Sequence, residues 1–126
     1  MKIALLGYGT VGRGVDEIIS SRVPQVEVAR ILELPDRITD ARMTASFDDI
    51  VADPEVELVV ECMGGVEPAR TYIMSALQAG KHVVTSNKAV VAAHFAEFAA
   101  AAQMAGVGLY IEASVGGGIP WIAGIE

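Results

Sequence analysis

The sequence has very little cysteine, few basic residues and no long apolar run, and each shortage excludes a class of protein. Its one cysteine, Cys62, cannot form an internal disulfide. The nine lysines and arginines are scattered, so no basic stripe is available for nucleic-acid phosphates. No stretch approaches the roughly eighteen apolar residues of a membrane span, and the apolar run before Gly7 is too short for a signal peptide. We expect a cytoplasmic protein without nucleic-acid or membrane partners.

The chain is rich in apolar residues and carries a net negative charge. A hydrophobic content of 52% and a mean hydropathy of +0.45 are high for 126 residues, and the net charge is −7 with a pI near 4.7. A chain of this size is one domain that buries roughly two-thirds of its unfolded surface. We expect a single domain over residues 1–126, with exposed apolar patches that promote some self-association.

A glycine fingerprint stands at the start of the chain. An apolar run leads directly into Gly7-x-Gly9-x-x-Gly12, and a helical pattern follows. In a Rossmann fold the first glycine makes a tight turn, the second lets the backbone approach a pyrophosphate, and the third lets helix and strand pack closely. The first amides of the helix, around Thr10 and Val11, would then face the phosphates. The alternative is a plain tight turn between a strand and a helix.

Strand and helix patterns alternate along the rest of the chain. Short apolar runs predict strands at residues 2–6, 26–32, 43–45, 58–60, 81–84 and 107–111. Helical patterns lie between them: one from the fingerprint to about residue 22, a short one capped by Ser46, one opened by Glu67 and Pro68, and an alanine-rich one over about 93–105. This order predicts an α/β fold, a Rossmann-type doubly wound parallel sheet.

In such a sheet, ligands bind outside the carboxyl ends of the strands, at the switch point between the first and fourth strands. Glu33 ends the second strand, where a Rossmann fold usually carries the acid that holds the adenosine ribose. Two further loops reach the same edge and supply the other candidate cofactor contacts, which are Met63, Gly64, Gly65, Thr85, Ser86 and Asn87.

Lys88 follows a predicted strand end, which places an ammonium group beside the nicotinamide end of the cleft. A lysine there donates a proton or polarises a carbonyl if burial lowers its pKa. A solvated loop lysine explains the spacing equally well.

Two glutamates, Glu61 and Glu112, end buried strands, where an unpaired carboxylate would be costly. A helix N-terminus is the simplest partner for Glu61, whereas a cation, a lysine or the following glycine loop would satisfy Glu112. Cys62 is better explained as a small buried residue than as a nucleophile, because no histidine stands near it in sequence. Packing explains His82 and His94, which have no partner at metal-ligand spacing.

Five motifs carry a family resemblance. They are Gly7-x-Gly9-x-x-Gly12, Glu61-Cys62-Met63-Gly64-Gly65, Glu67-Pro68-Ala69, the run from Ala79 to Lys88 and the run from Glu112 to Pro120. Together they closely resemble the N-terminal domain of homoserine dehydrogenases over nearly the whole chain. The resemblance implies an enzyme that interconverts L-homoserine and L-aspartate 4-semialdehyde with NAD or NADP, on the path to threonine, methionine and isoleucine.

The resemblance also implies roles for single residues. Lys88 corresponds to an active-site lysine that helps to move the proton at the substrate carbonyl. Glu112 and the backbone carbonyls of Val115 and Gly117 match a monovalent-cation site, for sodium, in some members. A carboxylate at Glu33 would repel the 2′-phosphate of NADP, although Arg37 is near enough in sequence to reach it, so we expect NAD to be favoured.

The family continues beyond these motifs into a substrate-binding and dimerisation domain that this chain does not contain. We therefore expect an isolated nucleotide-binding domain that binds dinucleotide weakly and turns over little or no substrate. Two alternatives stay open. The first is a domain of another small amino-acid or semialdehyde dehydrogenase, which would leave the loops at Asn87-Lys88 and Glu112 unexplained. The second is a non-catalytic dinucleotide-sensing module, which suits the short length.

Overall fold

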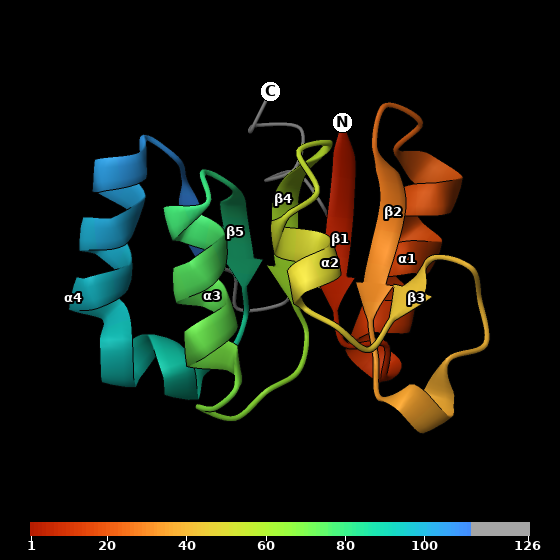
Figure 1. The fold of residues 1–126 in the computed structure, drawn as a ribbon, viewed down its shortest axis with the longest axis horizontal. Helices are drawn as coiled ribbons and strands as arrows, with labels where there is room; N and C mark the ends of the chain where they lie inside the picture. The colour runs from red at the N-terminus through yellow and green to blue at the C-terminus, as the bar shows by residue number, and fades with distance from the viewer. Residues whose placement is uncertain (112–126) are drawn as a thin grey trace.

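A six-stranded parallel sheet forms the centre of the molecule in the computed structural model, which describes residues 1–111 (Figure 1). The strand order is β3-β2-β1-β4-β5-β6, so the chain winds outward from β1 in both directions. The predicted Rossmann-type sheet is therefore confirmed. The strands are β1 (Lys2–Leu6), β2 (Glu27–Leu32), β3 (Met43–Thr44), β4 (Val56–Glu61), β5 (His82–Thr85) and β6 (Leu109–Ile111).

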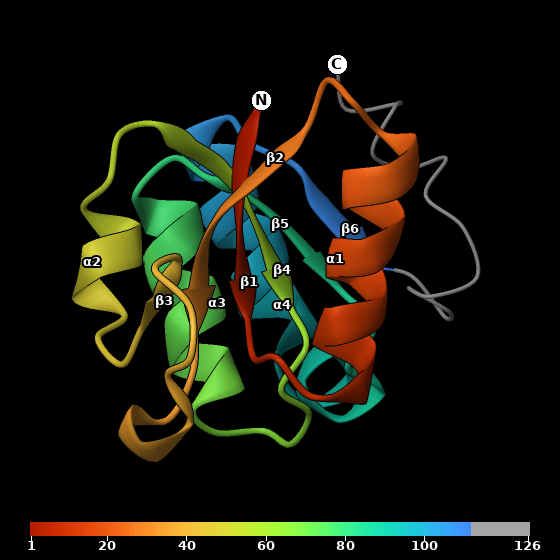
Figure 2. The ribbon, with the colours of Figure 1, turned by 90° about the vertical axis from the view of Figure 1, so that its right-hand side faces the viewer.

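Helices cover both faces of the sheet (Figure 2). Side chains that alternate along β1 explain the layering, since Ala4 and Leu6 pack on one face and Ile3 and Leu5 on the other. One face carries α2, α3 and α4, while α1 packs on the opposite face over β1 and β2. The helices are α1 (Thr10–Arg22), the 3-10 turn η1 (Pro35–Arg37), α2 (Asp48–Val51), α3 (Ala69–Gln78) and α4 (Lys88–Ala105).

Two predictions about helix starts are wrong. The alanine-rich helix α4 begins at Lys88 rather than near residue 93, because the side chain of Asn87 accepts a hydrogen bond from the Val90 amide and caps the helix. A kink at His94, with φ of −135°, separates this early turn from the rest of α4. Ser46 does not cap α2, since the residue at the cap position is Phe47 and no side chain caps that helix.

Glycines end both long helices on this face of the sheet, α3 and α4. Gly80 after α3 and Gly106 after α4 have φ of 83° and 71°, the left-handed conformation that ends a helix and that glycine adopts without strain. Among residues 1–111, no helix is both long enough and apolar enough to cross a membrane.

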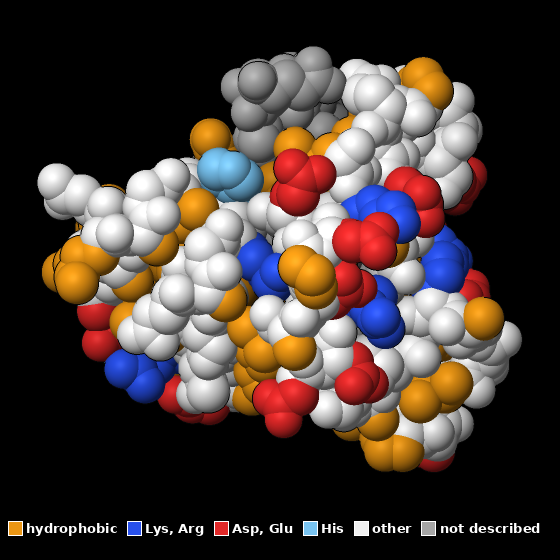
Figure 3. Space-filling model, turned by 45° about the horizontal axis from the view of Figure 1, so that its top comes forward, with side chains coloured by type: hydrophobic (Ala, Val, Ile, Leu, Met, Phe, Trp, Pro, Cys, Tyr) orange, Lys and Arg blue, Asp and Glu red, His pale blue; other side chains and the backbone are white. Residues whose placement is uncertain are grey.

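The amino-terminal edge of the sheet is held by ion pairs and by a buried lysine. Lys2 pairs with Glu55, and Arg30 with Asp53, each at 2.6 Å. Lys81 is 5% exposed, and its ammonium group donates to the carbonyls of Asp53 and Val56, both at 2.7 Å. Figure 3 turns this edge toward the viewer and shows basic side chains interleaved with acidic ones. The opposite, carboxyl-terminal edge of the sheet lies at the bottom of Figure 1, and the loops that follow the strands gather there.

Candidate functional site

The fold requires glycine at two of the three fingerprint positions and not at the third. Gly7 has φ of 104°, a conformation that favours glycine, and its amide donates to the Leu32 carbonyl. A Cβ atom on Gly12 would lie 2.2 Å from the carbonyl oxygen of Gly7. Gly9, by contrast, has an ordinary φ of −80°, and a Cβ atom there would meet nothing within 4 Å. The fold needs Gly7 and Gly12, but it leaves open space in front of Gly9.

Gly9 is also the N-cap residue of α1. No side chain caps this helix, and no acidic residue stands in its first turn, which contains Thr10 and Val11. The first backbone amides of a helix have no partner within it and carry partial positive charge. The open space at Gly9 therefore lies at a helix end that attracts an anion.

Two adjoining cavities extend from the glycine loop along the carboxyl edge. The first, which we call the base-side cavity, has a volume of about 390 Å³ and mostly apolar walls from Leu32, Leu34, Pro35, Ala45, Met63, Pro68 and Tyr72. The second, the ribose-side cavity, has a volume of about 520 Å³ and is lined by Tyr8, Gly9, Thr10, Arg13, Glu33, Arg37, Thr39 and Met43. Tyr8, Gly9, Glu33 and Arg37 line both.

Charges of both signs meet at the junction of the two cavities. Glu33 follows β2 and is half-buried, and its carboxylate accepts a hydrogen bond from the Leu34 amide at 2.8 Å. Arg37 lines the same junction from η1. Arg13 stands on α1, with its guanidinium 5.4 Å from the centre of the Tyr8 ring and its Nε donating to the Tyr8 carbonyl at 3.2 Å. The cavities thus offer one carboxylate and two guanidinium groups to a ligand.

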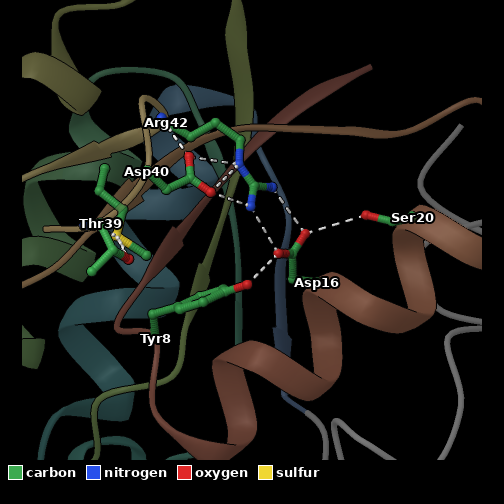
Figure 4. Close-up of polar contacts among 7 residues, drawn as sticks. Tyr8, Asp16, Ser20, Thr39, Asp40 and Arg42 are labelled. Carbon is green, nitrogen blue, oxygen red and sulfur yellow. Dashed lines mark hydrogen bonds and ion pairs between the residues drawn. The ribbon is translucent and has the colours of Figure 1, made fainter. Parts of the chain in front are cut away.

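Behind the ribose-side cavity lies a polar cluster that we call the Asp16 network (Figure 4). Asp16 on α1 is only 6% exposed. Its two carboxylate oxygens accept hydrogen bonds from both terminal nitrogens of Arg42, each at 3.1 Å, and one of them accepts from the Tyr8 hydroxyl at 2.6 Å. Asp40 binds the other side of the Arg42 guanidinium, and Ser20 donates to Asp16 at 3.3 Å.

The titration of the Asp16 network follows from these contacts. Burial alone would raise the pKa of Asp16, but the hydrogen bonds from Arg42 and Tyr8 outweigh it and hold that pKa below the ordinary carboxyl value. Hydrogen bonds from Arg42 also lower the pKa of Asp40, and the bond to Asp16 raises the pKa of Tyr8. Both carboxyl groups are therefore ionised and Tyr8 is protonated at neutral pH.

A second, buried cluster holds the loops that follow β4 and β5. Glu61 is 1% exposed, and its Oε2 accepts hydrogen bonds from the amides of Met63 and Gly64, at 2.8 and 3.0 Å. Its Oε1 accepts from the Thr85 hydroxyl at 2.6 Å. The expected helix N-terminus is not the partner of Glu61, because the loop folds back over the carboxylate. These two amides consequently point into the protein and not toward the cavities.

The same cluster continues to the start of α4. Thr85 is fully buried, and its hydroxyl accepts a hydrogen bond from the Asn87 amide at 3.0 Å. The Asn87 side chain donates to the carbonyl of Gly65 while it caps α4. Gly64 and Gly65 have φ of 80° and 73°, so this turn suits glycine. Glu61, Thr85 and Asn87 together tie the loop after β4 to the loop after β5.

Lys88 is the first residue of α4, and its side chain is exposed. It stands on the expected edge of the sheet, but it lines neither of the two cavities. Ser86, just before it, is half-buried. The half-buried Cys62 lines the base-side cavity, and burial, with Glu61 as a smaller cause, raises the pKa of its thiol to about 12. A thiol with this pKa is protonated at neutral pH, in agreement with a packing role.

The predicted cation site at Glu112, Val115 and Gly117 lies outside the described residues. Within residues 1–111, no three His, Cys, Asp or Glu side chains gather as metal ligands.

Sequence reasoning missed the Asp16 network, although a signal was present. Gly12, Val15, Asp16 and Ile19 form the buried stripe of α1. A carboxylate on the apolar stripe of a helix needs a partner, and that partner had to come from outside the helix. Nothing in the spacing identified Arg42.

A parallel sheet with order 3-2-1-4-5-6, a glycine loop leading into a helix N-terminus, and an acid after β2 define a dinucleotide-binding domain of the Rossmann class. A family profile described as "Homoserine dehydrogenase, NAD binding domain" matches residues 7–112. The chain belongs to this family, and the cofactor class of its cleft is a nicotinamide dinucleotide.

Individual relatives agree with the profile. A homoserine dehydrogenase from Synechocystis is 43% identical over 97% of this chain and 31% of its own length, and one from Lactococcus lactis is 39% identical over 95% and 32%. The crystal structure of a homoserine dehydrogenase from Thiobacillus denitrificans matches with a TM-score of 0.81 at 37% identity, covering 90% of this chain and 30% of that one. The chain thus spans about a third of the length of these relatives.

Proposed function

We propose that this chain is the nucleotide-binding part of a homoserine dehydrogenase, which interconverts L-homoserine and L-aspartate 4-semialdehyde with a nicotinamide dinucleotide. The observation that carries the proposal is the open space at Gly9, because neither backbone conformation nor packing requires glycine there. A pyrophosphate at this point would face the uncapped start of α1 through Thr10 and Val11. Gly7 and Gly12 would shape the loop around it.

The adenine and nicotinamide ends of the dinucleotide would lie on opposite sides of the pyrophosphate along the cleft. The base-side cavity, with its apolar walls and Met63, suits a flat adenine ring. The nicotinamide end would lie across the switch point, toward the loops that contain Gly64, Gly65, Thr85, Ser86 and Asn87. Because the amides of Met63 and Gly64 are occupied by Glu61, this loop would offer a ligand its carbonyl groups and its bare Cα surface.

We propose NAD as the favoured dinucleotide over NADP. The Glu33 carboxylate accepts one backbone amide and keeps its remaining oxygen positions for ribose hydroxyl groups, whereas a 2′-phosphate would be repelled. Arg13 and Arg37 line the same cavity and oppose this preference. Measuring NADH and NADPH affinities of the wild-type chain and of Glu33→Gln shows whether the carboxylate or the two arginines decide the preference. Tighter binding of NADPH than of NADH by the wild type would contradict the proposed preference for NAD.

The dinucleotide supplies hydride chemistry when it is bound, and we assign the accompanying proton transfer at the substrate carbonyl to Lys88. Its ammonium group stands at the first residue of α4, on the edge where the nicotinamide would lie. Glu112, with the carbonyls of Val115 and Gly117, is proposed to bind a sodium ion. In a full-length enzyme, Lys88→Ala should lower the rate of hydride transfer and leave cofactor affinity nearly unchanged.

The test of dinucleotide binding uses a substitution that separates binding from folding. Gly9→Asp supplies a good N-cap, so the free energy of unfolding should stay equal or rise by about 0.3 kcal/mol. The new carboxylate would occupy the space for the pyrophosphate and repel it, so NADH affinity should fall at least about tenfold, or roughly 1.4 kcal/mol. Nicotinamide fluorescence on titration with NADH measures the affinity, and thermal unfolding measures the stability.

Gly14→Ala is the matched control, because a Cβ atom there also meets nothing within 4 Å, and it lies one turn further along α1. It should leave NADH affinity unchanged. Wild-type protein that binds neither NADH nor NADPH would contradict the proposed function and favour an interaction role. Binding with activity on a different amino acid or semialdehyde would favour the other dehydrogenases.

We further propose that these 126 residues bind dinucleotide but oxidise little or no homoserine alone, since the relatives are about three times as long. Measurable homoserine oxidation by the purified chain would contradict this.

Self-association remains a prediction. Exposed Phe95 and Met104, at 52% and 90%, give α4 an apolar outer surface. A clean monomer in size-exclusion chromatography at high concentration would count against it. The cytoplasm likewise remains the predicted location.

A further inference from the structure

We propose that Asp16 is a positioning residue for the adenosine half of the dinucleotide, because its carboxylate joins the two walls of the ribose-side cavity from behind. The inference rests on the proposed function. Asp16 lines neither cavity, so it would act only through the residues that it holds. Figure 4 shows its carboxylate between Tyr8 on one side and Arg42 on the other.

The two walls come from different parts of the chain. Tyr8, Gly9, Thr10 and Arg13 belong to the glycine loop and the start of α1, whereas Glu33, Arg37, Thr39 and Met43 belong to the segment from the end of β2 to β3. The walls are joined at their base, because β1 pairs with β2 up to Leu6 and Leu32 and the Gly7 amide donates to the Leu32 carbonyl. Beyond this base, side-chain contacts behind the cavity hold the two walls together.

Asp16 makes such a contact to each wall. Toward the first wall, its Oδ2 accepts the hydrogen bond from Tyr8, the residue between Gly7 and Gly9. Toward the second, it binds Arg42, which lies in sequence between the two lining residues Thr39 and Met43. Because the pairing with Arg42 uses two parallel hydrogen bonds, it fixes orientation as well as distance.

Hydrogen bonds within the second wall also connect Arg42 to the residues that line the cavity. Asp40 accepts hydrogen bonds from the Arg42 amide at 2.7 Å and from its guanidinium at 2.8 Å. The Met43 amide donates to the Asp40 carbonyl, and the Thr39 amide donates to the Met43 sulfur. Movement of Arg42 would consequently move Thr39 and Met43 with it.

The network also decides which arginines remain for a ligand. Two carboxylates engage Arg42, so its guanidinium is committed to the protein. Arg13 and Arg37 line the cavity, and neither makes an ion pair with a described residue. Loss of Asp16 would therefore release the link between the walls, while Asp40 would still hold the Arg42 guanidinium.

The experiment compares two Asp-to-Asn substitutions. Asp16→Asn breaks the paired hydrogen bonds to Arg42, because an amide group cannot accept at both positions. Asp53→Asn breaks a similar ion pair, to Arg30, at the amino-terminal edge away from both cavities. NADH affinity is measured by nicotinamide fluorescence, ADP-ribose affinity by calorimetry, and stability by thermal unfolding, each on the complete chain.

We expect Asp16→Asn to weaken NADH and ADP-ribose by the same factor, about tenfold, which corresponds to roughly 1.4 kcal/mol. ADP-ribose carries the whole adenosine half, so the equal factor locates the effect there. Asp53→Asn should lower the unfolding temperature by a similar amount and leave both affinities unchanged. Tyr8→Phe, which keeps the ring and removes one hydroxyl, should weaken both ligands by a smaller common factor, and it serves if Asp16→Asn does not fold.

Unchanged NADH affinity in Asp16→Asn and Tyr8→Phe would overturn the inference, and so would a loss for NADH without a loss for ADP-ribose. An equal loss of affinity in Asp53→Asn would also overturn it, because the effect would then follow stability alone. If the wild-type chain binds no dinucleotide, the proposed function fails first and this inference falls with it.

Discussion

The two halves of the carboxyl edge hold their loops by different physical means. On the side of β1 and β2, the glycine loop is fixed by backbone packing. The Asp16 network joins it to the segment before β3, and in this network Asp16 is buried whereas Arg42 and Asp40 are about one-third exposed. On the side of β4 and β5, one fully buried carboxylate, Glu61, binds backbone amides and the Thr85 hydroxyl. The first half is open to a ligand, and the second is closed around its own acid.

This difference predicts where substitutions will be felt. A buried charge that loses its hydrogen bonds, or leaves donors unpaired, strongly destabilises a protein, whereas a partly exposed ion pair contributes little to stability. Changes near Glu61 should therefore appear mainly as loss of stability. Changes in the Asp16 network should appear mainly as loss of dinucleotide affinity, with a modest effect on folding.

Gly12→Ala should have the largest effect of all, and it should affect both properties. The new Cβ atom would lie 2.2 Å from the carbonyl oxygen of Gly7, which belongs to backbone that cannot shift without strain. We expect a loss of about 3 kcal/mol in the free energy of unfolding, together with loss of NADH binding. Chemical denaturation and fluorescence titration measure the two effects.

Gly14→Ala is the control for this change, because it lies on the same helix and has open space at its Cβ position. It should stabilise the chain by about 0.5 to 1 kcal/mol, since alanine favours helix more than glycine does. A Gly12→Ala protein as stable as the wild type would show that the close packing of helix and strand is not needed.

Glu61→Gln should have the next largest effect, and here stability should fall more than affinity. An amide in place of the carboxylate cannot accept from the Met63 and Gly64 amides and from Thr85 together, so at least one buried donor loses its partner. We expect a loss of about 1 to 3 kcal/mol in the free energy of unfolding.

The matched control is Glu57→Gln, an exposed position on the same strand, β4, which should change stability by less than about 0.5 kcal/mol. If Glu61→Gln weakened NADH binding at unchanged stability, the contrast between the two halves would be wrong. Glu61 would then belong to the binding machinery and not to the framework of the loop.

The same contrast explains how much the sequence could predict. The glycine loop was readable, because Gly7 and Gly12 answer local steric needs and the strand before them is a continuous apolar run. The strand order followed from the alternation of strands and helices, together with the right-handed crossover rule. These features depend on neighbours in the chain, so their signal is local.

The partners of buried charges were not readable in the same way. Glu61 was recognised as a carboxylate in need of a partner, but the fold-back of the Met63–Gly64 amides depends on the three-dimensional path of the loop. Asp16 and Arg42 are 26 residues apart, and only the packing of α1 beside the segment before β3 brings them together. The start of α4 was missed because the alanine-rich pattern concealed the cap at Asn87.

Asn87→Ala should have a smaller effect, confined to the half that contains Glu61. It removes the cap on the Val90 amide and the hydrogen bond to the Gly65 carbonyl, which joins the two loops. We expect a loss of about 1 kcal/mol in the free energy of unfolding and faster amide exchange in the first turn of α4. Asn87→Asp keeps the cap and loses the hydrogen bond to Gly65, so it should recover most of the stability. Equal losses in both variants would assign the role to the link between the loops.

Arg42→Gln should have the smallest effect on stability, because Asp16 keeps the hydrogen bonds from Tyr8 and Ser20, and its pH dependence should identify the Asp16 network. Because the pKa values of Asp16 and Asp40 are lowered in the folded protein, their contribution is present above the unfolded carboxyl pKa and is lost as the pH falls through the folded values. The stability difference between wild type and Arg42→Gln should thus be fully present at pH 7, at about 1 kcal/mol for the partly exposed pair with Asp16, and should shrink below roughly pH 4.

Arg22→Gln is the matched control, because it also removes one positive charge. Arg22 lies in the last turn of α1 and makes no ion pair with a described residue, whereas Arg42 pairs with Asp16 of that helix. Its stability difference from the wild type should change little over the same pH range. The decisive comparison is at pH 7, where Arg42→Gln should weaken NADH by a larger factor than its small loss of stability alone would produce, because the cavity walls are released while the fold stays intact. If affinity instead fell only in proportion to stability, the Asp16 network would resemble the Glu61 cluster, and the two halves of the edge would work alike.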